Sequence, residues 1–187
     1  VAPTYNVNVS AQGGSQNSSY YMSGGYVDQE GILENTSYNK ANFRINNDNK
    51  YGERLSFGTS INLSTSLQHG TSNAAGDAYN ISPTIPLYEA DGVTPGYDKH
   101  PGETGINPVY MANLSNPDHR TYKVLGNIYA EYKIFDFLRF RINAGLDFNY
   151  YEKKSFTPTY NIADKYGNTR SSYEETRGKN VTWLTDY

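Results

Sequence analysis

The sequence predicts an all-β protein: an antiparallel up-and-down transmembrane β-barrel of which only a part is present. Three observations favour this fold class. Long segments alternate apolar and small polar residues, the connectors between them alternate in length, and charges stay on the polar side. Six to seven such strands are visible, which are too few to close, because bacterial single-chain barrels have about eight or more. We therefore expect residues 1–187 to be part of a single transmembrane β-barrel domain with long extracellular loops.

The composition agrees with this class and excludes others. The 187 residues carry a formal net charge of −3 and include 19 tyrosines and no cysteine. No apolar run approaches the ~20 residues that a spanning helix needs, so a helical membrane protein is excluded. The near-neutral charge provides no basic surface for nucleic acid.

Three strands are predicted in the first quarter of the chain, at residues 4–11, 18–27 and 39–48. The first places Tyr5, Val7 and Val9 on one side and asparagines on the other, which is the two-residue period of a half-buried strand. Gly13-Gly14 predicts a turn after it. A connector of moderate length begins after the second strand.

The fourth predicted strand, residues 55–67, has the clearest alternation. Its odd positions are apolar apart from two threonines, and its even positions are small and polar or glycine. The pattern lasts about twice as long as an ordinary strand. A long stretch follows, about residues 68–120, with most of the prolines and no sustained period. Loops of this length are usually functional or disordered.

The fifth and sixth predicted strands, residues 122–134 and 138–150, are separated by the minimal turn Phe135-Asp136-Phe137. A second long polar loop is expected at about residues 153–178. Residues 180–187 have the pattern of the first half of a seventh strand, which ends with the chain.

The six connectors are, in order, short, medium, short, very long, short and long. In an up-and-down meander the odd and even connectors lie at opposite ends of the sheet. The tight turns near Gly14, Gly52 and Asp136 therefore share one end. Short periplasmic turns and long extracellular loops are typical of outer-membrane barrels, so we predict a bacterial outer-membrane location.

The charged residues of the strands lie on the polar side, where a water-filled lumen would solvate them. An arginine or lysine on the lipid side at mid-membrane costs roughly 2–4 kcal/mol. A soluble sandwich with a solvated face also tolerates such charges, but strand length favours the barrel. The predicted lumen-facing polar residues are Arg44, Glu131, Arg139, Arg141, Asn143 and Asp147.

No catalytic constellation emerges, so we do not expect an enzyme. The histidines His69, His100 and His119 lack the spacing of metal ligands, and we predict neither a metal nor another cofactor. Tyrosines near strand ends suit an interfacial aromatic girdle, and we assign Tyr5, Tyr132 and Tyr150 to it. Candidate substrate contacts in the long loop are Tyr79, Tyr88, Asp91 and Tyr97; the alternative for these tyrosines is loop packing, and for Asp91, which precedes Gly92, a turn.

Several stretches also resemble one family in their residues. They are residues 5–10, 20–32, 42–46, 126–132 and 138–141, and the second contains Asp28-Gln29-Glu30-Gly31. These stretches resemble the SusC/RagA family of TonB-dependent transporters, and the resemblance extends over nearly all of the chain.

This resemblance implies a large barrel of about 22 strands with an N-terminal plug domain. It further implies import of glycans, oligosaccharides or peptides, driven by the TonB complex beneath a SusD-like surface lipoprotein. The plug and the TonB box are absent from these residues, so we expect energy coupling to depend on other parts of the polypeptide. Two alternatives remain open: a passive outer-membrane barrel or surface-adhesion protein, and a soluble secreted carbohydrate-binding β-domain.

Overall fold

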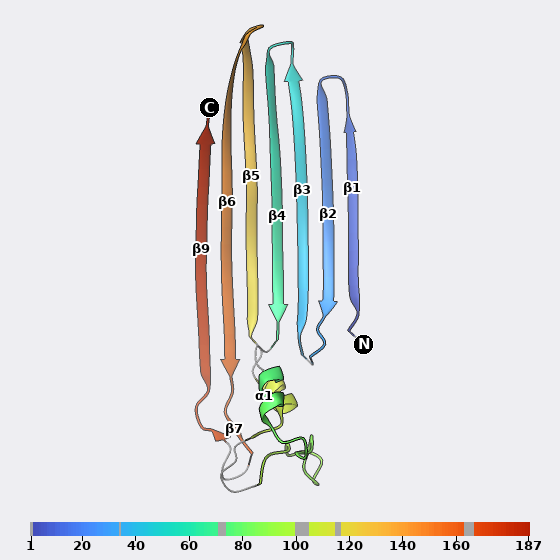
Figure 1. The fold of residues 1–187 in the computed structure, drawn as a ribbon, viewed down its shortest axis with the longest axis vertical. Helices are drawn as coiled ribbons and strands as arrows, with labels where there is room; N and C mark the ends of the chain where they lie inside the picture. Colours follow the sequence, from blue (N-terminus) through green and yellow to red (C-terminus); the bar gives the residue numbers. More distant parts are fainter. Residues whose placement is uncertain (1, 34, 71–73, 100–104, 115–116, 163–166) are drawn as a thin grey trace.

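A computed structural model describes residues 2–33, 35–70, 74–99, 105–114, 117–162 and 167–187. Seven long antiparallel strands form one sheet in the order β1-β2-β3-β4-β5-β6-β9 (Figure 1). Their bounds are Thr4–Gly14, Ser18–Glu30, Ser37–Tyr51, Leu55–His69, Asp118–Phe135, Leu138–Thr157 and Ser172–Asp186. Each strand pairs with the next one along the sheet, and β1 and β9 remain edges. The structure thus confirms a partial, open up-and-down β-sheet.

The connectors divide between two ends of this sheet. Tight turns join β1 to β2, β3 to β4 and β5 to β6 at one end, which we call the turn end (Figure 1). Gly52 in the second turn has a φ of 64°, a left-handed conformation that glycine adopts at little cost. The other end, the loop end, carries α1 (Ala74–Asn80), α2 (Pro108–Leu114) and the small hairpin β7 (Tyr160–Asn161) and β8 (Gly167–Asn168).

The strand register gives the sheet two chemically distinct faces. One row of aligned residues across five strands is entirely apolar: Phe43, Leu63, Val124, Phe148 and Val181. The adjacent row, on the opposite face, is Arg44, Asn62, Leu125, Asp147 and Thr182. We call the first side the outer face and the second the inner face. Successive residues point to opposite faces of a strand, so the alternation in the sequence appears directly as this division.

Aromatic side chains lie near both ends of the apolar outer face. Towards the loop end, the rings of Tyr122 and Tyr150 have centroids 6.2 Å apart. Towards the turn end, Tyr132 lies opposite Leu55 and Phe140. From Tyr122 to Tyr132, β5 rises about 34 Å at ~3.4 Å per residue. A strand tilt of about 40° reduces this to a height of about 26 Å, close to the ~25 Å apolar band of outer-membrane barrels.

The sheet has no second layer among the described residues. The buried hydrophobic residues of this part of the chain, Ala112 and Ile162, both belong to the loop end, as does the buried Pro95. On the outer face Val9 is 70% exposed and Ile128 is 56% exposed. A soluble β-sandwich would bury such a face against another sheet, so lipid is the environment that fits it. Neither described helix is long and apolar enough to cross a membrane.

The strands extend further towards the loops than the alternation predicts. The second loop spans residues 158–171 instead of 153–178, and the seventh strand, predicted only as a half strand, begins at Ser172. Charged side chains interrupt the apolar pattern at Glu152, Lys154, Glu175 and Arg177. The backbone ladder continues past them because these side chains form ion pairs with one another across the two strands.

The first loop also contains more order than its sequence suggests. It was expected to have no regular structure over about residues 68–120, but it contains α1 and α2. Each helix has only 7 residues, which is too short for helical periodicity to stand out in the sequence.

Candidate functional site

A cluster of charged and aromatic side chains covers the inner face near the turn end. Glu131 of β5 forms ion pairs with two arginines of β6: its Oε1 lies 3.5 Å from Arg139 Nη1 and its Oε2 lies 3.9 Å from Arg141 Nη1. The register places Glu131 directly opposite Arg141, so the strand pairing itself brings these charges together. The Glu131 side chain is 25% exposed, whereas both arginines are at least half exposed.

Tyr129 connects this cluster to β3 across an intervening strand. Its hydroxyl donates a hydrogen bond to Asp48 Oδ1 at 2.7 Å, and the Arg141 guanidinium carbon lies 4.2 Å from its ring centroid. Gly58 of β4 is aligned between Asp48 and Tyr129. A Cβ atom on Gly58 would lie 2.4 Å from Asp48 Oδ1 and 2.5 Å from the tyrosine ring. The hydrogen bond between Tyr129 and Asp48 can therefore cross β4 because Gly58 has no side chain.

The remaining predicted inner-face residues belong to the same polar surface. Asn143 accepts a hydrogen bond from Arg141 Nε at 3.0 Å and donates one to Asp186 at 2.6 Å. Asp147 lies 3.4 Å from Lys123 Nζ. Arg44 and Asp147 both line a pocket of about 510 Å³.

All six predicted lumen-facing residues thus lie on the inner face, and this face is polar over most of its extent. That this face lines the lumen of a closed barrel stays a prediction. Its mixture of carboxylates, guanidinium groups, amides and a phenol can bind polar solutes or another polypeptide by hydrogen bonds. In the described part of the chain, no group of three or more His, Cys, Asp or Glu side chains is arranged to hold a metal ion.

One polar pair at the loop end was missed by the sequence reasoning. His69 Nδ1 lies 2.6 Å from Asp118 Oδ1, because the last residue of β4 is aligned with the first residue of β5. The sequence separates them by the whole first loop, and only the strand register could have indicated the contact. His100 lies outside the described residues.

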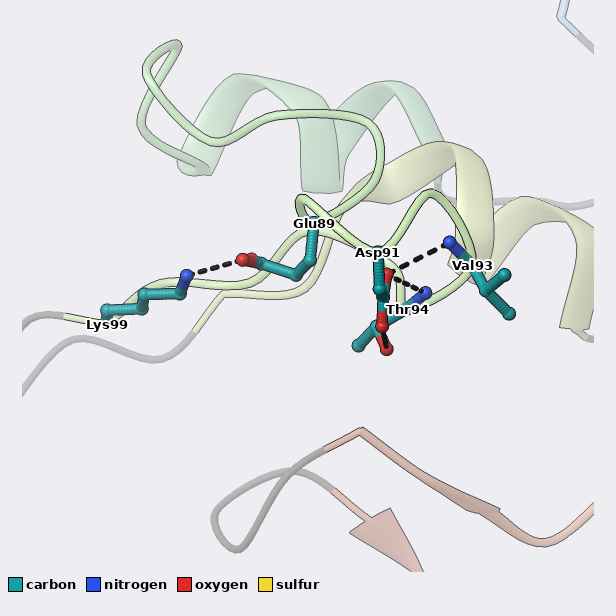
Figure 2. Close-up of polar contacts among 5 residues, drawn as sticks. All are labelled: Glu89, Asp91, Val93, Thr94 and Lys99. Atoms are coloured by element: carbon teal, nitrogen blue, oxygen red, sulfur yellow. Dashed lines mark hydrogen bonds and ion pairs between the residues drawn. The ribbon is translucent and has the colours of Figure 1, made fainter.

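The candidate loop residue Asp91 has a structural role in a tight turn (Figure 2). Its Oδ1 accepts hydrogen bonds from the backbone N–H groups of Val93 at 3.0 Å and Thr94 at 2.8 Å, and its Oδ2 accepts one from the Thr94 hydroxyl. These bonds, the hydroxyl bond first, hold the pKa of Asp91 below its ordinary value. Gly92 within the turn has a φ of 68°. The geometry favours the turn interpretation; substrate contact by Asp91 stays a prediction.

Glu89 and Lys99 pair across the same loop (Figure 2). The hydrogen bond from the ammonium group to Glu89 raises the pKa of Lys99 above its ordinary value. The Lys99 ammonium also lies 5.5 Å from the ring centroid of Tyr97. This places one predicted substrate residue beside a fixed positive charge.

The three candidate tyrosines differ in their exposure to solvent. Tyr79 is 90% exposed on α1, and Tyr88 is 50% exposed beside a backbone bridge to Pro95. Tyr97 forms a bridge with Ile106 and is partly buried. Two of the rings are therefore open to solvent, as a sugar-stacking or peptide-contacting residue would need to be.

The two long loops pack on each other, which the sequence did not reveal. Tyr110 of α2 and Tyr160 of β7 meet edge to face with ring centroids 6.3 Å apart. Asn107 caps the start of α2, since its Oδ1 accepts the Val109 N–H at 2.9 Å, and its amide donates to the Pro86 carbonyl. Apart from Gly58 in β4, the buried residues of the described chain, among them Ile162 at 2% exposure, lie in these loops. The loop end is thus a small packed unit beyond the ends of the long strands.

Comparison with known proteins identifies what this arrangement is similar to. No protein-family model matches the chain. TonB-dependent receptor P26 of Formosa agariphila is 34% identical over 158 residues, which are 83% of this chain and 16% of that protein. TonB-dependent receptor P3 of the same organism is 29% identical over 170 residues. The chain spans about a sixth of the length of these curated relatives.

Solved structures agree on the fold. A structure of the RagAB peptide importer in its open-open state matches 97% of this chain with a TM-score of 0.78 at 20% identity, and 21% of the matched chain is covered. A structure of the RagAB peptide transporter matches with a TM-score of 0.76. These likenesses confirm the fold of a SusC/RagA-type barrel segment. The TonB-dependent receptors named above, together with this fold, place the segment in the outer membrane.

Proposed function

We propose that this chain, a barrel segment of the SusC/RagA type, forms part of the wall of an outer-membrane importer of large nutrients. The observation that carries the proposal is the pairing of an apolar outer face with a mostly polar inner face, next to two loops that pack on each other. Such a wall suits a protein that keeps lipid on one side and a hydrated solute path on the other. The proposed role is transport, not catalysis.

The proposed nutrients are glycans, oligosaccharides or peptides. A peptide substrate gains support from the fold likeness to a structure described as a peptide importer. The proposed partners are a SusD-like surface lipoprotein at the loop end and the TonB complex, which would act through parts of the protein outside residues 1–187. The names of the curated relatives support the TonB partner.

Energy-dependent uptake by the full-length parent protein tests the function. A strain whose gene for the parent protein is deleted should lose growth on one nutrient class when glycans and peptides are supplied separately as the sole carbon source. Re-expression should restore growth, and deletion of tonB should remove it again. Uptake that persists without TonB would instead indicate a passive barrel, and unchanged growth on every nutrient would contradict import.

The loop tyrosines provide a test of the proposed substrate contacts. Tyr79→Ala, Tyr88→Ala and Tyr97→Ala in the parent protein should each weaken binding of the identified nutrient several-fold, since an aromatic ring stacked on a ligand contributes about 0.5–1.5 kcal/mol. Tyr173→Ala is the matched control, because Tyr173 is also exposed but belongs to β9 on the outer face. Affinities equal to wild type for all three variants would exclude these tyrosines as substrate residues.

A further inference from the structure

A band of charged side chains continues the outer face beyond the apolar belt, towards the loop end. Directly past the Tyr122–Tyr150 ring pair, β5 contributes Arg120 and β6 contributes Glu152 at aligned positions. The charged residues of β5, β6 and β9 on this face, which we call the outer charged band, are Asp118, Arg120, Glu152, Lys154, Glu175, Arg177 and Lys179. These residues lie on the outer face, which lipid covers nearer the turn end. The band therefore lies at the level of the headgroups of the outer leaflet.

Four members of the band form a compact ion-pair cluster. Glu152 receives Lys154 Nζ at 2.9 Å and Arg177 Nε at 3.0 Å. Glu175 lies 2.5 Å from Arg177 Nη2 and 3.8 Å from Lys154 Nζ. Both carboxylates are therefore neutralised within the cluster. Arg177 remains 58% exposed and Lys154 43% exposed, while Glu152 is only 16% exposed, so the cluster presents its cations outwards.

The two other cations flank this cluster. Arg120 and Lys179 are exposed, and neither forms an ion pair with any residue in the described part of the chain. The register separates them by two strand spacings and one same-face step, so their Cα atoms lie about 12 Å apart. The band thus has four cations against three carboxylates. Asp118 contacts His69 and the other two carboxylates belong to the ion-pair cluster, so Arg120 and Lys179 are the charges of the band left without a partner among the described residues.

An apolar groove lies on the same face, on the turn-end side of Arg120. It has a volume of about 420 Å³, and the side chains that line it on the outer face are Ala41, Phe43, Leu63, Thr65, Tyr122 and Val124. Tyr122 is the next outer-face residue after Arg120 on β5. The cations and the groove therefore follow one another along the membrane normal. A molecule with an anionic head and hydrocarbon chains could place its head against the cations and a chain in the groove.

We propose that the outer charged band and the apolar groove together bind a phosphorylated, multiply acylated lipid of the outer leaflet. Arginine and lysine form strong charge-assisted hydrogen bonds with phosphate oxygens. Arg120 and Lys179 contact the phosphate groups, the exposed sides of Lys154 and Arg177 complete the cationic surface, and an acyl chain occupies the groove. The inference rests on the outer-membrane location of the barrel and is independent of what the protein imports.

Lipid retention by the full-length parent protein tests this assignment. The protein, purified in a neutral detergent, is titrated with diphosphoryl lipid A, and bound lipid is counted by native mass spectrometry. The double variant Arg120→Gln/Lys179→Gln should bind lipid A about thirtyfold more weakly, because each cation near a lipid surface contributes about fivefold. Lys153→Gln is the matched control. Lys153 neighbours the band on β6 but points to the inner face, so its loss should leave lipid A binding unchanged.

Three results would overturn the proposal. The first is a double variant that folds, as judged by heat-modifiable gel mobility, and retains as much lipid A as wild type. The second is an equal loss in Lys153→Gln, which would indicate a diffuse charge effect. The third is displacement of bound lipid A by an equal concentration of inorganic phosphate, which would show that the groove contributes nothing.

Discussion

Glycine at position 58 illustrates how single residues determine the polar surface. Tyr129 reaches from β5 to Asp48 on β3 only because Gly58 on β4 leaves the space between them empty. Arg141 then lies over the ring of Tyr129 and beside Glu131. The residue type at one position of β4 thus allows a connected polar cluster to span four neighbouring strands, β3 to β6.

We predict that Gly58→Ala destabilises the parent barrel. The new Cβ would lie 2.9 Å from the backbone oxygen of Asn47 as well as against the Asp48 and Tyr129 side chains, and overpacking of this kind costs typically 1–3 kcal/mol. Urea unfolding of the full-length protein in lipid vesicles measures the effect. Gly126→Ala is the control, because nothing lies within 4 Å of its added Cβ. Equal midpoints for Gly58→Ala and wild type would contradict the assigned contact.

A second residue-scale prediction concerns the pH dependence of the Asp91 turn. The folded-state pKa of Asp91 is lowered by the Thr94 hydroxyl and by the Val93 and Thr94 N–H groups. A carboxyl with a lowered folded-state pKa stabilises the turn fully above its unfolded pKa of about 4, and this stabilisation is lost as the pH falls through the folded value. Amide exchange protection of Val93 and Thr94 should therefore stay constant from about pH 7 to 4 and decrease below.

Asp91→Asn provides the control for this pH dependence. The amide oxygen of asparagine still accepts N–H bonds, so some protection should remain, but it should not change with pH. A decrease between about pH 7 and 5 in the wild-type protein would contradict the assignment to Asp91, because its lowered pKa places its titration below that range.

At the scale of elements, the strands were predictable where one face is uniformly apolar. The alternation over residues 55–67 fixes which side of β4 faces lipid, and the register confirms this division. The alternation could not reveal the parts of β6 and β9 nearest the loop end. There, charged pairs such as Glu152 with Arg177 connect the two strands, and the sequence has no apolar pattern. The contact between Tyr110 and Tyr160 was unpredictable for another reason: it joins two loops that are far apart in sequence.

The assignment of faces predicts opposite effects for arginine at two neighbouring positions. Leu146 of β6 lies near the middle of the apolar belt, and Asn127 of β5 lies close to it on the inner face. Leu146→Arg should cost roughly 2–4 kcal/mol, the cost of an arginine at the bilayer midplane, whereas Asn127→Arg should be tolerated in a hydrated lumen. The amount of folded full-length protein in outer membranes checks this. Similar yields of the two variants would mean that the faces are wrongly assigned.

At the scale of the whole molecule, the sheet is one section of a β-barrel. Its edges β1 and β9 are unpaired with each other, and open strand edges are not tolerated within lipid. The strand order, the two faces and the position of the loops were all deducible from the sequence, since each follows from the local alternation and connector length. The substrate was not, because exposed loop rings such as Tyr79 and Tyr88 suit a sugar and a peptide equally well.

Site-directed spin labelling along β6 of the full-length protein, in outer-membrane vesicles, tests the central claim most directly. Labels at consecutive positions 145–149 are compared for collision with oxygen, which partitions into lipid, and with a water-soluble nickel chelate. Positions 146 and 148 should favour oxygen, and positions 145, 147 and 149 should favour the chelate, because the outer face meets lipid and the inner face meets water. A two-residue alternation in this sense is the predicted result; equal accessibility at all five positions, or alternation of the opposite sense, would contradict a barrel wall with these faces.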